Sequence, residues 1–89
     1  MTRDQLETDL RSLPKVQSVS VEGNGQLIAT VVSGSFEQLD EGKRQKLVWT
    51  HLWSRHSDEP YQLSNIEFIF TNAPDEEKPG EIEPDEGKG

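Results

Sequence analysis

The sequence contains no cysteine. This absence excludes disulfides, a thiolate nucleophile and any metal site that would need cysteine ligands from this chain. Long apolar runs are also missing: no segment approaches the ~18 apolar residues of a membrane span, and no N-terminal stretch resembles a signal peptide. Because a chain without cysteine suits a reducing compartment, we expect a cytoplasmic protein that does not enter a membrane.

Apolar residues are few as well, at 30% of the 89 residues, which is low for a globular chain. They concentrate before Ala73, and Ile82 is the only large apolar residue after it. A chain of this length forms one domain, and such a small core leaves little room for the roughly 300–1,000 Å³ of a typical substrate cavity. We therefore expect residues 1–73 to form one domain that is not an enzyme.

Acidic residues dominate the end of the chain. Residues 74–89 hold seven acids against Lys78 and Lys88, so −5 of the formal net charge of −8 lies there. A segment with so little apolar surface cannot offset its ordering entropy, which predicts a disordered acidic tail over 74–89. The remaining residues are mildly acidic and lack the general basic footprint of a nucleic-acid-binding domain.

Local patterns predict the first three elements. Thr2 and Gln5 fit a capping box, and an apolar stripe follows at helical spacing, so a helix is expected over 3–12. Pro14 ends this pattern. Residues 16–22 alternate and residues 27–32 form a β-branched apolar run, with Gly23-Asn24-Gly25 between them. Since these turn residues accept positive φ, the pattern predicts an antiparallel hairpin.

The second half predicts a helix over 40–55, then a loop or a short, poor helix over 56–65, and a strand over 66–71 with Ile66, Phe68 and Phe70 on one face. This element order predicts an α+β fold: a small three-stranded mixed sheet with two main helices packed on one face, in the order α-β-β-α-(short α)-β. The residues expected in the core are Leu6, Leu10, Val31, Val48, Leu52 and Phe68.

Candidate chemical groups are sparse. His51 and His56 lie five residues apart, about 140° around a helix, so they are not expected to chelate one metal. Lys43, Arg44 and Lys46 form the only basic cluster of the expected domain; they would be a partner or nucleic-acid contact, or simply a solvated helix face. Trp49 and Trp53 share a helix face and would pack in the core, unless one is exposed and becomes an interface candidate.

Together, the element order and the segment 31–52 resemble the BolA family. The matching residues are Val31-Val32-Ser33-Gly34-Ser35-Phe36, then Arg44-Gln45-Lys46 and Leu47-Val48, with Leu52 closing the helix. Farther along, a strand over 66–70 leads into Ala73-Pro74-Asp75-Glu76, which is also similar. The resemblance covers about residues 4–76 and implies a BolA-like fold, which itself resembles a class II KH domain.

The departures from the family concern its ligands. The resemblance implies a histidine just before the last strand, and a second Cys or His in the hairpin loop, that help to hold a [2Fe–2S] cluster shared with a monothiol glutaredoxin. The matching positions here are about Ser64 and the loop Gly23-Asn24-Gly25-Gln26, with neither ligand. No Gly-x-x-Gly loop, which a KH domain needs, is present.

These observations predict a non-enzymatic, BolA-like protein-binding or regulatory module with no cofactor or metal. A monothiol glutaredoxin is a partner that the resemblance implies. The alternative is a nucleic-acid-binding transcriptional regulator that uses the basic face of the second helix, at Lys43, Arg44 and Lys46.

Overall fold

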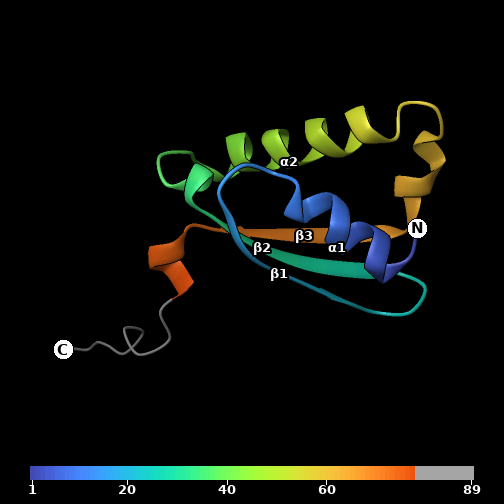
Figure 1. Ribbon diagram of the computed structural model, residues 1–89, viewed down its shortest axis with the longest axis horizontal. Coiled ribbons are helices and arrows are strands. Elements are labelled where there is room, and N and C mark those ends of the chain that lie inside the picture. Colours follow the sequence, from blue (N-terminus) through green and yellow to red (C-terminus); the bar gives the residue numbers. More distant parts are fainter. Residues whose placement is uncertain (78–89) are drawn as a thin grey trace.

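The computed structural model describes residues 1–77 (Figure 1). Its helices are α1 (Arg3–Arg11) and α2 (Glu41–Arg55), and its strands are β1 (Val16–Glu22), β2 (Leu27–Ser33) and β3 (Ile66–Asn72). Short 3-10 turns η1 (Gly34–Phe36), η2 (Pro60–Asn65) and η3 (Pro74–Glu77) join or follow them. The order of the main elements is the one that the sequence predicted.

Each main helix begins where a side chain satisfies its first free N–H groups. Thr2 and Gln5 form the capping box at the start of α1: the Thr2 hydroxyl accepts from the backbone N–H of Gln5, and the Gln5 side-chain oxygen accepts from the backbone N–H of Thr2. At the start of α2, the Asp40 carboxylate accepts from Lys43 N at 2.9 Å. Such caps stabilise a helix by about 1 kcal/mol each.

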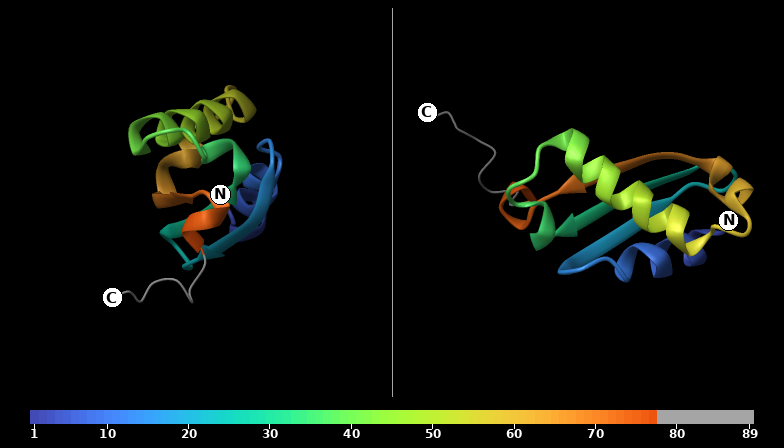
Figure 2. Two further views of the ribbon diagram at one scale, coloured as in Figure 1. Left: turned by 90° about the vertical axis from the view of Figure 1, so that its left-hand side faces the viewer. Right: turned by 90° about the horizontal axis from the view of Figure 1, so that it is seen from above.

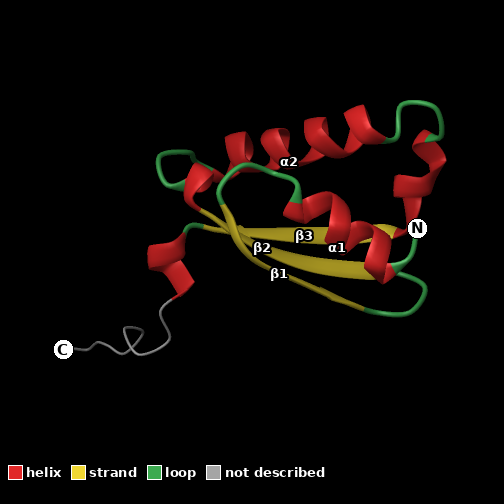
Figure 3. Ribbon diagram, in the orientation of Figure 1, coloured by secondary structure: helices red, strands yellow, loops and turns green. Residues whose placement is uncertain are grey.

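The three strands form one mixed sheet in the order β1-β2-β3 (Figure 3). The hairpin partners β1 and β2 are antiparallel, whereas β3 lies parallel to β2 at an edge. Both α1 and α2 contribute buried leucines to a single core against the sheet. The left view of Figure 2, which looks along the strands, shows η3 away from α2. The predicted α+β fold, a three-stranded mixed sheet with two main helices, is confirmed.

The core joins residues from every main element. Five of the six residues expected there are fully buried, namely Leu6, Leu10, Val31, Val48 and Leu52. Leu27, Ile69 and Phe36 are also fully buried. Burying a side chain of this size stabilises the fold by roughly 1.5–3 kcal/mol, so these residues account for much of the stability of so small a domain.

The sixth expectation, a buried Phe68, was wrong: Phe68 is 43% exposed and Phe70 is 51% exposed. The cause is an irregularity in the pairing of β2 with β3. Leu27 pairs with Ile66, but Ile28 pairs with Phe68, so Glu67 is skipped. A one-residue slip exchanges the two faces of a strand. Ile66 and Ile69 therefore face the core, and the two phenylalanines face the opposite side.

Short 3-10 helices flank β3. Part of the loop or short, poor helix expected over 56–65 is a 3-10 helix, Pro60–Asn65, begun by Pro60. After β3, Ala73 is buried and η3 contacts β2 and β3, while the domain boundary expected at residue 73 stays a prediction. The rest of the predicted tail, residues 78–89, lies outside the described residues. Within residues 1–77 no helix is long and apolar enough to cross a membrane.

Candidate functional site

The predicted basic cluster does not form one surface. Lys43 and Lys46 are exposed, but Arg44 is only 9% exposed. Its Nε donates to the carbonyl oxygens of Phe36 at 3.1 Å and Leu39 at 2.8 Å. A nucleic-acid contact by Lys43 and Lys46 stays a prediction. Arg44 would reach a phosphate only by leaving these carbonyls.

Arg44 instead helps to occupy free backbone carbonyls at the β3 edge of the sheet. Its Nη1 donates to the carbonyl of Thr71 at 3.2 Å, and the neighbouring Gln45 Nε2 donates to the carbonyl of Ile69 at 2.8 Å. Both acceptors belong to the edge strand β3. Unpaired backbone groups on an edge strand invite pairing with another chain. Side chains of α2 occupy these two carbonyls, which opposes strand addition at this edge.

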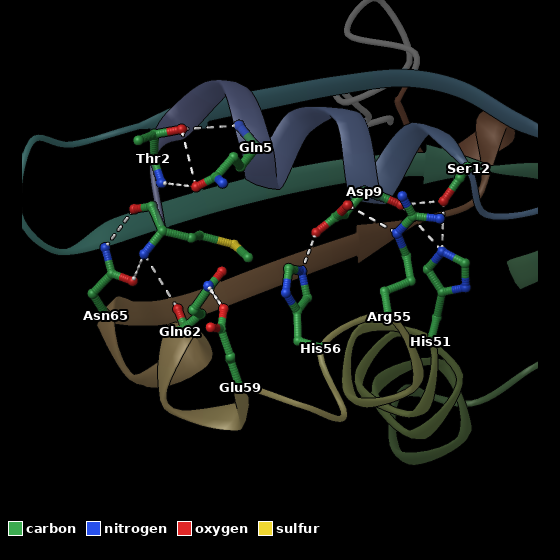
Figure 4. A network of polar contacts seen from close by, with 11 residues as sticks. Thr2, Gln5, Asp9, Ser12, His51, Arg55, His56, Glu59, Gln62 and Asn65 are labelled. Carbon is green, nitrogen blue, oxygen red and sulfur yellow. Dashed lines mark hydrogen bonds and ion pairs between the residues drawn. The ribbon is translucent and has the colours of Figure 1, made fainter.

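The two positions to which the resemblance assigns cluster ligands do lie together. Asn65 follows Ser64 directly before β3, and its Nδ2 donates to the carbonyl of Gly25 in the hairpin loop at 2.9 Å. The Met1 amino group also donates to Asn65 Oδ1 at 2.8 Å (Figure 4). The fold therefore brings together the two positions to which the resemblance assigns ligands, with Ser64 exposed beside them.

The residues at this location do not fit a [2Fe–2S] cluster. Iron–sulfur ligation needs a thiolate or an imidazole, whereas the side chains here are the Ser64 hydroxyl, the Asn65 amide and the amides of Asn24 and Gln26. The Asn65 amide is already committed to Met1 and Gly25. In the part of the chain that the structure describes, no group of three His, Cys, Asp or Glu residues is arranged to hold a metal ion.

Both histidines point from α2 and its C-cap toward α1 (Figure 4). His56 Nε2 lies 2.5 Å from Asp9 Oδ2, and Arg55 Nε donates to Asp9 Oδ1 at 2.9 Å. Asp9 is only 6% exposed. Arg55 of α2 and His56 at its C-cap each hold one carboxylate oxygen of Asp9, so this cluster is an anchor between the two helices.

The same region contains a serine next to a histidine, but not a nucleophile. Ser12 Oγ donates to the carbonyl of Asp9 at 2.6 Å and lies 2.7 Å from His51 Nε2. His51 Nε2 is also 3.1 Å from that carbonyl, which can only accept. Because the one hydroxyl proton of Ser12 goes to this carbonyl, it is not directed at the imidazole in this arrangement. The adjacent hollow, lined by Asp4, Gln5, Thr8, Asp9 and His56, measures about 260 Å³ and is open to solvent.

We expect the substitution Asp9→Ala to lower the free energy of unfolding by about 1–3 kcal/mol, because it leaves His56 and Arg55 without their buried acceptor. Thr8→Ala, at an exposed site one residue away on α1, should change it by no more than about 0.5 kcal/mol. Urea denaturation of both variants measures the difference. Equal stability of the two variants would show that the anchor contributes nothing.

The largest feature that the sequence did not predict is the exposed side of the sheet, opposite α1 and α2. Here Ile28 lies beside Phe68 and Thr30 beside Phe70, as the pairing of β2 and β3 dictates. The two phenylalanine rings are in edge-to-face contact, with centroids 4.7 Å apart. Ile28 is 38% exposed. We call Ile28, Phe68 and Phe70, with Thr30 between them, the open face.

Two more aromatic side chains are exposed on other elements. Trp53 on α2 is 52% exposed and Tyr61 in η2 is 69% exposed. Trp49, by contrast, is half-buried, and its Nε1 donates to Gln45 Oε1. Trp53 therefore meets the condition under which it becomes an interface candidate.

Comparisons with solved structures agree on the architecture, whereas comparisons of sequence find no match. No family model matches the sequence, and no curated protein is detectably similar to it. Among solved structures, BolA1 from Arabidopsis thaliana superposes with a TM-score of 0.62 at 19% identity, covering 85% of this chain and 95% of that one.

Two further solved structures give the same result. A bol-like protein from Babesia bovis has a TM-score of 0.62 at 23% identity, with 85% of this chain and 88% of that one covered. A BolA homologue from Coxiella burnetii has a TM-score of 0.60 at 24% identity, with coverages of 85% and 95%. The chain therefore has a BolA-like fold, as the resemblance over residues 4–76 implied.

Proposed function

We propose that this chain is a non-enzymatic, BolA-like module that acts by binding another protein, in a regulatory role and without ligating an iron–sulfur cluster. The observation that carries the proposal is the open face, where two adjacent phenylalanines and an isoleucine remain exposed on a domain of marginal size. Contiguous exposed apolar patches on a folded domain mark interaction sites, and aromatic residues are enriched at protein interfaces.

Catalysis has less support. The hollow beside Asp9 and His56 is open to solvent, and these two side chains are bonded to each other in the contact between α1 and the end of α2. The hydroxyl of Ser12 is committed to a backbone carbonyl. A nucleophile needs a base that accepts its proton, and His51 does not fill that role in this geometry.

The fold supports a partner of the kind that the family uses, a monothiol glutaredoxin, but the local chemistry supports a different mode of binding. The ligand positions of the resemblance hold Ser64 and a hairpin loop of glycine and amide residues. A serine hydroxyl stays protonated near neutral pH and is a poor iron ligand. We therefore infer that such a partner would be recognised through the surface of the fold and would keep its cluster unchanged.

Mixing the purified chain with a cluster-loaded monothiol glutaredoxin should leave the visible absorption and circular dichroism spectra of the cluster unchanged. A new ligand from this chain would shift these bands, because cluster spectra respond to the donor set. A shift that disappears in His51→Ala or His56→Ala would contradict the proposal and identify the ligand. A shift that survives both substitutions would contradict it as well.

A further inference from the structure

The open face has a definite chemical character. Besides its three large apolar side chains it presents small polar groups, because Ser20 of β1 pairs with Thr30 of β2 on the same side. Val32, at the η3 end of the same side, is buried. The bare part of the face is thus an apolar stripe along β2 and β3, bordered by hydroxyl groups along β1 and by η3 at one end.

The charges around this stripe have one sign. The three strands contain two acidic residues, Glu22 and Glu67, and neither lysine nor arginine. Glu22 pairs with Ile28 and so borders the stripe at one end, while the exposed Asp75 follows β3 at the opposite end. The cation closest to β1 in sequence is Lys15. It precedes the strand, and its side chain lies beside Gly34 of η1.

These charges argue against several occupants. Nucleic acid and anionic membranes would meet the carboxylates of Glu22 and Asp75, and the three strands offer neither lysine nor arginine. A second copy, packed face to face, would bring its acidic ends near Glu22 and Asp75, and the net charge of −8 on each chain opposes self-association. The chain's own residues 78–89 carry four acids against two lysines and only one large apolar residue, Ile82, so this segment matches the stripe poorly.

We propose that the open face binds an amphipathic helix of a partner protein, with an apolar stripe along one side and lysine or arginine residues at its borders. This inference rests on the proposed binding function and specifies the chemistry of the partner. The apolar side chains of such a helix recur at i, i+3, i+4 and i+7 and would cover Phe68, Phe70 and Ile28. Its basic residues would lie near Glu22 and Asp75.

The geometry of the sheet suits this occupant. A sheet buries its faces by packing helices against them, and the other face of this sheet is already covered in that way by α1 and α2. The pairing edge at β3 is occupied by the side chains of Arg44 and Gln45, which opposes addition of a partner strand there. A helix laid across the open face needs no backbone pairing and completes a three-layer arrangement.

The probe is a synthetic peptide of leucine and lysine, patterned so that it forms an amphipathic basic helix, added to the isotope-labelled full chain. We expect it to shift the amide resonances of Ile28, Thr30, Phe68 and Phe70 and to become helical on binding. Phe68→Thr combined with Phe70→Thr, which keeps β-forming residues in the strand, should weaken binding about 10-fold or more. The matched control Tyr61→Ala removes an exposed aromatic side chain from η2 and should leave the affinity unchanged.

Charge is tested separately. Glu22→Lys should weaken binding about 3-fold to 10-fold at low salt, whereas Asp58→Lys, at an exposed site after α2, should have no effect. The inference would be overturned by equal binding of a leucine–glutamate peptide, by amide shifts confined to α2, or by no binding at all. A dimer in sedimentation equilibrium that Phe68→Thr/Phe70→Thr dissociates would also overturn it. So would changes in the amide resonances of residues 78–89 in the unbound double variant, because they would identify these residues as the occupant of the open face. These outcomes leave the proposed binding function standing, because a protein partner could bind another surface of the fold.

Discussion

Replacing Ile69 by alanine should lower the free energy of unfolding by about 2–5 kcal/mol, whereas Phe68→Ala should lower it by about 1 kcal/mol. Ile69 is fully buried between the sheet and the helices, so its truncation leaves a cavity that the core fills only in part. Phe68 has the larger side chain, but 43% of it is already exposed to water. The smaller residue is thus expected to have the larger effect.

Urea denaturation followed by far-ultraviolet circular dichroism gives both values. Because total stabilities of domains are only about 5–15 kcal/mol, Ile69→Ala is expected to remove a large fraction of the free energy of unfolding. Leu52→Ala, at a fully buried site of α2, is the positive control. A loss for Phe68→Ala equal to that for Ile69→Ala would mean that β3 has the unslipped register, with Phe68 in the core.

Replacing Arg44 by alanine should cost about 2–4 kcal/mol, because the substitution removes charge-assisted hydrogen bonds and leaves buried carbonyl oxygens without donors. Its acceptors include the carbonyls of Phe36, Leu39 and Thr71, so one guanidinium joins η1, the approach to α2 and the edge strand. Arg44→Lys should recover less than half of this loss, since a lysine ammonium lacks the planar fork that reaches several acceptors together.

The neighbouring lysines provide the matched controls for Arg44. Lys43→Ala and Lys46→Ala remove the same charge from the same helix at exposed positions, and each should change the stability by no more than about 0.5 kcal/mol. Thermal and urea unfolding of the four variants tests the comparison. If Arg44→Ala is no worse than Lys43→Ala, the guanidinium does not stabilise the fold and is available for a ligand.

Local signals in the sequence were sufficient for most of the architecture. The capping box at Thr2 and Gln5 and the turn at Gly23-Asn24-Gly25 act over a few residues, and the structure forms the helix and hairpin that they predicted. The face of β3 was not predictable in the same way. Ile66, Phe68 and Phe70 alternate regularly, and only the pairing with β2, which skips Glu67, turns the phenylalanines outward.

The candidate site shows the same division between local and tertiary information. The sequence grouped Lys43, Arg44 and Lys46 by spacing, but a buried guanidinium depends on carbonyls from residues 36, 39 and 71 that only the fold brings together. Conversely, the absence of a ligand at Ser64 and in the hairpin loop was visible in the sequence. The structure adds that these two places are adjacent, through the contact of Asn65 with Gly25.

Quantitative affinity capture from the native source tests the central claim, that this chain acts by binding a protein, most directly. Three full-length baits would be compared: the wild type, Phe68→Thr/Phe70→Thr and Tyr61→Ala, with the captured proteins measured by mass spectrometry. We predict a set of proteins enriched by the wild type and by Tyr61→Ala and lost from the double variant. Capture of nothing above the level of the bare matrix by any of the three baits would contradict the claim.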